Sequence, residues 1–239
     1  MAKSATRILA FDIGGTGLKA ALIDAKGKML SERLKVPTPP NCTPRQMVDA
    51  LVGMAKPLAP HDHISIGFPG VVRGDRVLTA PHWGTKKWVD FPLASALSKR
   101  LGDTPARLIN DAEMQGLAVI RRKGLELVLT LGTGAGTGLF RDGELMPHLE
   151  LAHHPLHKGL TYNDYVGNEA LHRHGKKRWN RHVRSTLDVL ESLLHYDHLY
   201  IGGGNATRVT FKLPANVTLV SNDAGLEGGA ALWRWAVRD

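Results

Sequence analysis

The chain has 239 residues, of which 43% are hydrophobic and 22% are charged, and this composition is typical of a globular protein with a substantial core. Its net charge of +9 favours an anionic partner, whether a nucleic acid, a polyanion or a phosphorylated metabolite. A single cysteine, Cys42, excludes an internal disulfide and a zinc site built from several cysteines. No stretch is apolar over the length of a bilayer span and the first residues lack a signal-peptide core, so we expect a cytoplasmic protein without a membrane partner.

Residues 7–24 predict a β-hairpin around a glycine-rich turn. Residues 7–13 and 18–23 are apolar runs typical of buried antiparallel strands, and the turn between them holds Gly14, Gly15, Thr16 and Gly17. Backbone N–H groups in such a turn can converge on one anion, and Asp12 at its mouth can hold Mg²⁺ against phosphate oxygens. An ordinary hairpin, with glycines present only for turn geometry, fits this stretch equally well.

A second copy of the same plan lies at residues 127–146. Its apolar run ends in the turn Gly132-Thr133-Gly134-Ala135-Gly136-Thr137-Gly138, and the first copy continues into a third strand expected at residues 29–36. This repeat indicates an internal duplication. It predicts two similar lobes that face a cleft, each of which grips part of one phosphate chain.

Helices and strands alternate between the two copies. Thr43 and Pro44 begin a helix that is expected to reach Leu58, and residues 63–68 predict a strand. That strand ends in Gly67-Phe68-Pro69-Gly70, a turn placed where α/β folds bind ligands, although a plain turn fits as well. The following loop, WGTKKW at 83–88, either clamps a substrate or covers the edge of the core, and we favour the core.

The pair Asn110-Asp111 lies between a strand expected at 107–109 and a helix expected at 112–122. Asp111 can act as the N-cap of this helix, which requires no chemistry. It can also act as a carboxylate at the edge of a cleft that accepts a hydroxyl proton, while Asn110 holds a neighbouring hydroxyl. The residues alone favour the cap.

Residues 148–157 hold four histidines and one glutamate. The lack of a nearby thiol and the irregular spacing disfavour a zinc site. Glu150 and His153 instead offer sugar hydroxyls an acceptor and a donor three residues apart.

A capping box of Thr161 and Asp164 predicts a helix that ends near Gly175. The next helix has an apolar row at helical spacing, which indicates a core face: Val183, Leu187, Leu190 and Leu194. Basic residues share another face beside Trp179, and this face is either solvated surface or a binding surface for anions: Arg173, Lys177, Arg181 and Arg184.

Residues 198–201 predict a strand that enters a third glycine turn. This turn, Gly202-Gly203-Gly204-Asn205, can admit a nucleotide base or sugar closely because glycine has no side chain. A final helix is expected at residues 225–237, with Trp233 and Trp235 near its end.

Six segments resemble, in the same order, the motifs of the ROK family of sugar kinases and regulators, and above all its polyphosphate glucokinase branch. These segments are DIGGTGLKAAL, IGFPG, LINDAEMQGLA, LTLGTGAGTGLF, ELAHH and LYIGGGN. The resemblance spans nearly the whole chain and implies the actin/hexokinase-like α/β fold, a duplicated ribonuclease H-like architecture with a cleft between two lobes. It implies an N-terminal lobe over 1–110, completed by a helix at 225–239, and a C-terminal lobe over 111–224.

The resemblance also implies roles for individual residues. Asp111 matches the general base that takes the proton of the sugar's 6-hydroxyl. The matching sugar-binding positions, with the weakest match last, are Asn110, Glu150, His153, Gly70 and Glu169. The matching phosphate segments are Asp12 with Gly14, Gly15 and Thr16, and Gly132 with Thr133 and Gly134. The matching adenosine segment is Gly202, Gly203 and Gly204, and Lys19 with Mg²⁺ would neutralise phosphate charge.

Three features depart from the family pattern. Ala152 stands where the glycine before His153 is usual, His82 stands where asparagine is frequent near the sugar, and the common cysteine-rich zinc motif is absent, as it is in the polyphosphate branch.

We therefore expect a Mg²⁺-dependent hexose kinase that makes glucose 6-phosphate from glucose with polyphosphate, ATP or both, and that forms a homodimer. The first alternative is an ATP-dependent kinase of another hexose, such as mannose or an amino sugar. The second is a non-catalytic sugar sensor or nucleic-acid-associated protein. The presence of Asp12 and Asp111 disfavours this last alternative, because a binding module needs no general base.

Overall fold

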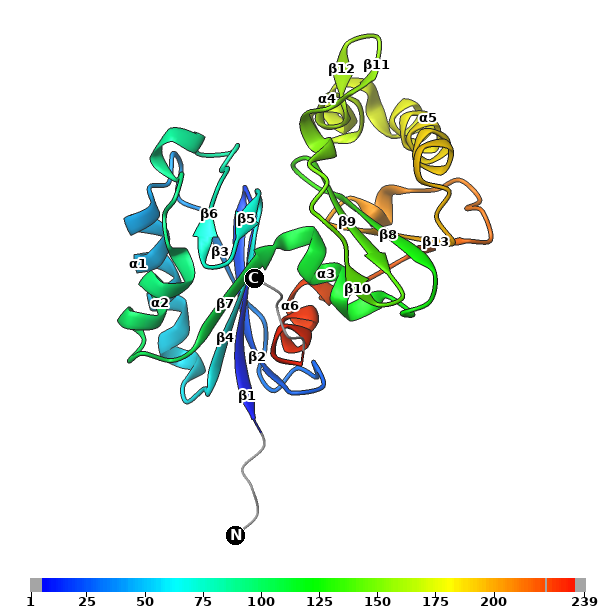
Figure 1. The fold of residues 1–239 in the computed structure, drawn as a ribbon. Helices are drawn as coiled ribbons and strands as arrows, with labels where there is room; N and C mark the ends of the chain where they lie inside the picture. The colour runs from blue at the N-terminus through cyan, green and yellow to red at the C-terminus, as the bar shows by residue number, and fades with distance from the viewer. Residues whose placement is uncertain (1–5, 222, 235–239) are drawn as a thin grey trace. The chain divides into compact units, whose positions relative to one another are not determined.

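The computed structural model describes residues 6–221 and 223–234, which form two compact units (Figure 1). The first unit contains residues 6–118 and 223–234, and the second contains residues 119–221. Helix α3 (Asp111–Val119) therefore lies almost entirely in the first unit, whereas the sequence-based division placed it in the second lobe. The reason is close packing, because Met114 lies against Gly67 and Gly228, where a Cβ atom would have no room.

The first unit is built on a five-stranded sheet in the order β3-β2-β1-β4-β7. Its strands are β1 (Arg7–Ile13), β2 (Gly17–Asp24), β3 (Leu34–Pro37), β4 (His63–Phe68) and β7 (Ala106–Asn110). The predicted β1–β2 hairpin is confirmed, and β4 and β7 run parallel to β1. The third strand is shorter than expected, because the Ser31 hydroxyl accepts the N–H of Leu22 and regular pairing resumes only at Leu34.

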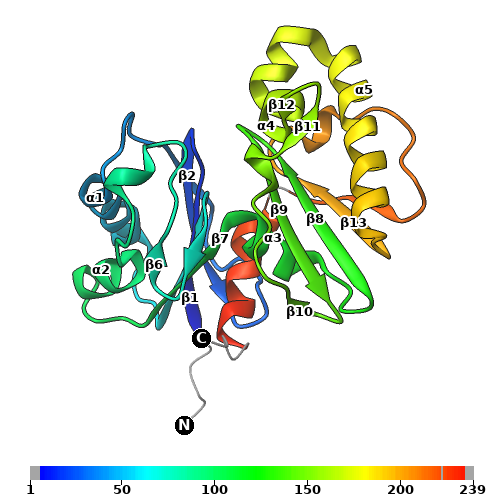
Figure 2. The same cartoon turned by 45° about the horizontal axis from the view of Figure 1, so that its top comes forward.

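Both faces of this sheet are covered, which explains why β1 is apolar at nearly every position (Figure 2). Leu9, Phe11 and Ile13 belong to the core that includes α1 (Pro44–Ala55) and α2 (Leu93–Arg100). Ile8 and Ala10 belong to a second cluster, with residues of α6 (Ala224–Glu227) and the 3₁₀ helix η5 (Gly228–Trp233). These two short helices replace the first part of the expected C-terminal helix, and residues 235–239, with Trp235, lie outside the described residues.

Smaller elements complete the first unit. They are the 3₁₀ helices η1 (Lys56–Leu58) and η2 (Thr85–Lys87) and the hairpin of β5 (Val72–Arg73) and β6 (Arg76–Val77). The predicted start of α1 is confirmed by a capping box in which Thr43 and Gln46 satisfy each other's backbone N–H groups. Trp83 and Trp88, on either side of η2, are buried against Phe68, so this loop packs on the core as we favoured.

The second unit repeats the sheet topology of the first, in the order β10-β9-β8-β13-β14. Its strands are β8 (Leu125–Leu131), β9 (Ala135–Arg141), β10 (Glu144–Leu145), β13 (His198–Gly202) and β14 (Val217–Leu219). In both sheets, three antiparallel strands are followed by two strands that run parallel to the first of them. The predicted internal duplication is therefore confirmed by the topology.

Helices α4 (Tyr162–Val166) and α5 (Asn168–Leu194) belong to the second unit, which also contains β11 (Pro155–His157), β12 (Leu160–Thr161) and the 3₁₀ helices η3 (Leu151–His153) and η4 (Ala206–Arg208). The predicted capping box of Thr161 and Asp164 begins α4. Gly175, with φ of 70° and ψ of 163°, breaks the helical course of α5 near the predicted helix end. Arg173 therefore does not share a helical face with Lys177, which corrects the predicted basic face.

Among the described residues, no helix combines the length and apolar character needed to cross a bilayer.

Candidate active site

The carboxyl ends of β1, β4 and β7 bring together three predicted site segments of the first unit. Asp12 pairs with Gly67 in the parallel ladder of β1 and β4, and a Cβ atom on Gly67 would lie 3.3 Å from the Cα of Asp111. Asp12 and Asp111 therefore lie on either side of Gly67. This edge is where α/β sheets bind their ligands, because the loops that follow adjacent parallel strands meet there.

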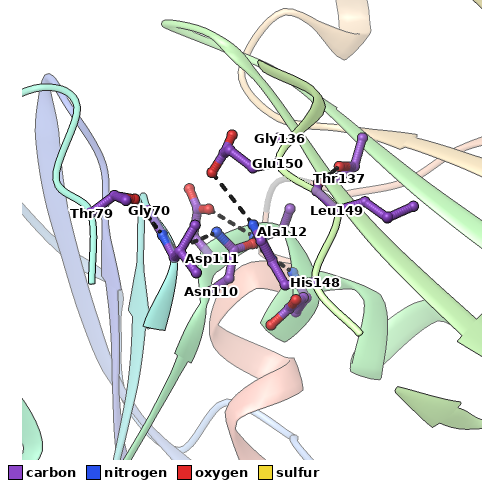
Figure 3. A network of polar contacts seen from close by, with 12 residues as sticks. Gly70, Thr79, Asn110, Asp111, Ala112, Gly136, Thr137, His148, Leu149 and Glu150 are labelled. Carbon is purple, nitrogen blue, oxygen red and sulfur yellow. Dashed lines mark hydrogen bonds and ion pairs between the residues drawn. The ribbon is translucent and has the colours of Figure 1, made fainter. Parts of the chain in front are cut away.

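Asn110 caps the start of α3 (Figure 3). Its Oδ1 accepts the N–H of Ala112 at 2.9 Å and the next N–H along the chain at 3.2 Å. Its Nδ2 donates to the carbonyl groups of Gly70 at 3.1 Å and Phe68 at 3.4 Å. Asp111 adds a second acceptor for the N–H of Ala112, at 2.9 Å. The cap that the sequence assigned to Asp111 is thus made mainly by Asn110. Asn and Asp are both common N-cap residues, so the sequence alone does not show which of two adjacent ones caps the helix.

The cap has a consequence for the chemistry of both side chains. Asn110 is 4% exposed and its amide already has four partners, so a sugar hydroxyl that binds it must replace one of them. The 3.4 Å contact with Phe68 is the longest and the cheapest to exchange. Asp111 is only partly buried, and the helix start does not depend on its carboxylate.

Asp12 and Lys19 form an ion pair at the mouth of the first glycine turn. The Lys19 Nζ donates to Asp12 Oδ2 at 2.7 Å, and the two residues face each other across the β1–β2 ladder. Their side chains are 15% and 17% exposed, so the pair is shielded from water and stronger than a surface ion pair. It fixes the carboxylate beside the turn and keeps a positive charge there.

The first glycine turn is held by residues that sequence reasoning missed. Thr38, just after β3, donates its hydroxyl to the carbonyl of Gly14 at 2.7 Å, and its N–H donates to the carbonyl of Thr16 at 3.3 Å. The His82 ring lies against Gly15, where an added Cβ would be 3.1 Å from it. His82 was noted only as a departure from the family pattern, and its contact with the turn had no signal in the sequence.

The donor set at this edge fits a magnesium ion carried largely by phosphates. Mg²⁺ is usually held by one or two carboxylates together with phosphate oxygens and water, and Asp12 supplies one carboxylate beside an exposed Thr16. In the described part of the chain, no three side chains of His, Cys, Asp or Glu converge as a resident metal site would require, and this includes the histidines of residues 148–157.

The second glycine turn is braced from three sides within the second unit. The carbonyl of Gly132 accepts the N–H of Asn168, the first residue of α5, at 2.9 Å and the Nδ2 of Asn205 at 3.3 Å. Asn163 of α4 accepts the N–H of Ala135 at 2.8 Å. The carbonyl of Thr133 also accepts the N–H of Asn168, at 3.3 Å, and the N–H of Gly132 donates to the carbonyl of Gly134 at 2.9 Å. The turn, with the N–H groups of Thr133 and Gly134, is therefore held in place before any ligand binds.

The third glycine turn lies directly beside the second. The parallel ladder pairs Thr130 with Gly202, and the N–H of Asn205 donates to the carbonyl of Leu131 at 2.8 Å. Gly203 has a φ of 83°, and an added Cβ would lie 2.5–2.8 Å from backbone atoms of Leu131. The predicted phosphate and adenosine segments therefore share one edge of the second sheet, and Gly203 permits their close approach.

Glu150 and His153 lie on the segment that follows β10. The carbonyl of Leu149 accepts the Thr137 hydroxyl at 2.6 Å, which anchors this segment to β9, and Glu150 lies 3.4 Å from the Nε2 of His148 (Figure 3). His153 is exposed at the end of η3.

Hydrogen bonds from Thr161 hold the pKa of Asp164 below its ordinary value, and the nearby positive charges of Arg173 and His153 contribute in the same direction.

Glu169, the weakest match among the predicted sugar-binding residues, lies at the start of α5. Its side chain is 80% exposed and forms an ion pair with Arg173 one helical turn later. It directly follows Asn168, which bonds to the second glycine turn, but its own carboxylate is directed into solvent.

Comparisons with known proteins place this arrangement in a family. A family model described as the ROK family matches residues 8–153, which is more than half of the chain. The chain belongs to the ROK family. The crystal structure of an inorganic polyphosphate/ATP-glucomannokinase from Arthrobacter sp. strain KM is similar to this ROK protein with a TM-score of 0.85 and 31% identity, covering 95% of this chain and 98% of that chain. The predicted actin/hexokinase-like fold is thereby confirmed.

Two curated relatives differ in how much of their length this ROK protein matches. A polyphosphate glucokinase of Mycobacterium tuberculosis is 28% identical over 236 residues, which cover 92% of this chain and 88% of the relative. An N-acetylmannosamine kinase of Escherichia fergusonii is 36% identical over 145 residues, which cover 58% of this chain and 48% of the relative.

Proposed function

We propose that this ROK protein is a hexose kinase that transfers the terminal phosphoryl group of inorganic polyphosphate or ATP to the 6-hydroxyl of glucose. The observation that carries the proposal is the pair at the carboxyl end of β7, where Asn110 makes the cap and Asp111 offers a carboxylate beside the Asp12–Lys19 pair. The names of two nearly full-length matches support it, since one is described as a polyphosphate glucokinase and the other as a polyphosphate/ATP-glucomannokinase.

In the proposed reaction, the 6-hydroxyl oxygen attacks the terminal phosphorus and the bond from that phosphorus to its bridging oxygen breaks. The hydroxyl proton passes to Asp111, and ADP or a polyphosphate shortened by one phosphate leaves. Asn110 ties the β7 end to Gly70, and it shares the N–H of Ala112 with Asp111. Backbone N–H groups of the first glycine turn and Lys19 stabilise the developing negative charge on the phosphoryl oxygens.

Magnesium, when bound, would shield the phosphate charge, and Asp12 is the residue that would hold it on the protein side. Within residues 132–134, Thr133 and Gly134 would contact donor phosphates through backbone N–H groups, since the N–H of Gly132 donates to the carbonyl of Gly134. Residues 202–204 would lie against the adenosine of ATP. Glu150 and His153 would orient sugar hydroxyls, as acceptor and donor. Glu169 would contact the sugar only after releasing Arg173, with which it pairs in solvent.

A different hexose is the second candidate. The Arthrobacter kinase is named for both glucose and mannose, and the relative with the higher identity over a shorter match acts on N-acetylmannosamine by its name. The segment that would decide the sugar is 150–153, where Ala152 stands in place of the usual glycine and His153 is exposed.

The direct test is formation of glucose 6-phosphate with Mg²⁺, measured with ATP and with long-chain polyphosphate, and repeated with mannose and N-acetylmannosamine. Asp111→Asn is the control that separates this enzyme from a contaminating kinase. Turnover that survives in the variant, or no turnover of any of the three sugars by folded protein, would contradict the proposal. A homodimer and a cytoplasmic location remain predictions, to be checked by light scattering and by fractionation.

A further inference from the structure

We propose that the second unit carries a binding track for the polyphosphate chain, formed by the exposed cations of α5 after Gly175 and by the loop that follows β13. This inference rests on the proposed function, because it extends the donor site of the same reaction. The track would hold phosphates beyond those that contact the second glycine turn.

The first observation is a one-sided charge distribution in sequence. No acidic residue occurs between Glu169 and Asp188, and none occurs between Asp197 and Asp223. These two acid-free segments contain the cations that we define as the basic track: Lys176, Lys177, Arg178, Arg181, Arg184, Arg208 and Lys212.

The second observation is that the two segments lie side by side. The Asn180 side chain, which is 8% exposed, donates to the carbonyl of Arg208 at 3.0 Å and accepts the N–H of Thr210 at 2.7 Å. The Arg184 guanidinium lies 4.8 Å from the ring centre of Phe211. A buried amide therefore fastens the loop to α5, and the segment that follows β13 runs beside this helix in the second unit (Figure 2).

The third observation is that the cations are exposed and electrostatically uncompensated. Lys176, Lys177, Arg178 and Arg181 are exposed, and within the described residues none of the four forms an ion pair. Their field also reaches a neighbour, because the charges of Arg178 and Arg181 add to burial in holding the pKa of His182 below its ordinary value. Unpaired like charges in this arrangement repel one another, and a polyanion relieves that repulsion.

The fourth observation connects the track with the donor site. Asn205 bonds to the backbone of the second glycine turn, through the carbonyl of Leu131 and that of Gly132. The N–H of Arg208 then donates to the carbonyl of Asn205 at 2.9 Å, so Arg208 lies one 3₁₀ turn from the residue that touches the phosphate segment. A phosphate chain seated at residues 132–134 can therefore continue past Gly204 to Arg208 and α5.

The chemistry of the surface favours polyphosphate over a single-stranded nucleic acid. Proteins that bind single strands combine cations with exposed aromatic rings on which bases stack. Here Trp179 is fully buried and donates its indole N–H to the carbonyl of Val166, and Arg184 lies over the ring of Phe211. Between residues 176 and 187 and between residues 198 and 221, no aromatic side chain is exposed. The track thus offers charge without a stacking surface, which suits a ligand that consists of phosphates alone.

The test compares two variants with the same net charge. The track variant carries Lys176→Gln, Lys177→Gln, Arg178→Gln and Arg181→Gln. The control variant carries the same substitution at four exposed cations of the first unit: Lys26, Arg45, Lys56 and Lys99. We expect the track variant to raise the KM for long-chain polyphosphate about tenfold and to weaken its salt dependence, since fewer counterions are released on binding. Its KM for ATP and for tripolyphosphate should stay within twofold, as should all constants of the control variant.

A chain-length series gives an independent readout. In the unchanged protein the KM per polyphosphate molecule should fall as the chain lengthens, and in the track variant this fall should disappear. Equal effects on ATP and polyphosphate, or an equal effect of the control variant, would overturn the inference.

Direct binding separates failure of the track from failure of the proposed function. If no sugar is phosphorylated, the proposed function fails, and calorimetric titration of long-chain polyphosphate into both proteins still tests the track. Equal polyphosphate affinity of the unchanged and track-variant proteins would overturn it. Tighter binding of a single-stranded DNA of equal charge, lost in the track variant, would assign the surface to nucleic acid instead.

Discussion

Asp111→Asn should abolish most activity and leave the fold almost unchanged. Loss of a general base lowers the rate by about 10²–10⁴-fold, which corresponds to about 3–5 kcal/mol of activation free energy. The free energy of unfolding should fall by only about 0.3–1 kcal/mol, the usual worth of an acidic residue in the first helical turn, because Asn110 still accepts the N–H of Ala112.

The comparison variant is Asn110→Ala, which should cost much more stability than Asp111→Asn. It removes an N-cap worth about 1 kcal/mol and leaves buried backbone groups without partners at about 1–3 kcal/mol, so we expect a loss of about 2–4 kcal/mol in unfolding free energy. Urea unfolding and a coupled assay of glucose 6-phosphate at saturating donor measure the two quantities. If Asp111→Asn kept more than a tenth of the turnover, or lost more than about 2 kcal/mol of stability, the division of roles between these neighbours would be refuted.

Three further predictions concern other parts of the chain. Gly203→Ala should lower the unfolding free energy by more than about 2 kcal/mol, because its φ is 83° and an added Cβ would meet the backbone of β8. At Gly204 an added Cβ has open space, so Gly204→Ala should change the unfolding free energy by less than about 0.5 kcal/mol. Equal effects of the two variants would contradict this reasoning. Burial holds the pKa of His182 below its ordinary value of 6.5, so the unfolded chain binds a proton that the folded chain refuses. Stability should therefore be full above about pH 6.5 and decline as the pH falls below it, and urea unfolding should show a shallower decline in His182→Gln. Lys19→Met should reduce kcat at least about tenfold, since it leaves the shielded carboxylate of Asp12 without its 2.7 Å partner, and steady-state kinetics that show only a raised KM for the sugar would argue against this role.

The sequence was most informative where local rules and the global fold agree. The two glycine hairpins follow from apolar runs that flank turn residues, and their duplication predicted two sheets of the same topology. The Thr43 and Thr161 capping boxes were visible because their partners lie three residues away. Features of this kind depend only on residues that are close in sequence.

The remaining features depend on contacts that sequence spacing does not encode. The brace of Thr38 on the first turn joins residues 24 positions apart, and the tie of Asn205 to Gly132 joins residues 73 positions apart. The predicted strand at 29–36 was too long because a side chain, Ser31, replaced a backbone partner. The predicted basic face wrongly included Arg173 because a helical wheel assumes an unbroken helix, and Gly175 breaks it.

Some properties of the candidate site residues could likewise be predicted from the sequence, and others required the contacts in the structure. Asp111 could be located from its position after a strand, but its freedom from the main capping role required the contacts of Asn110. Glu169 was proposed from motif order alone, and only its exposure and its pairing with Arg173 showed that it faces solvent. Trp179 was placed beside the basic face without a role, and the structure shows that it is a core residue that anchors α5.

The matching strand order of the two sheets has an evolutionary consequence. Asp12 in β1 and Thr130 in β8 occupy equivalent positions, because each is the next-to-last residue of the strand that enters a glycine turn. Asp12 carries a carboxylate, whereas Thr130 carries a hydroxyl that accepts the N–H of Gly136. In a homodimer of a single unit, every substitution appears in both copies, so the two positions could not have diverged. Fusion of the copies into one chain removed that constraint and allowed each half to specialise separately.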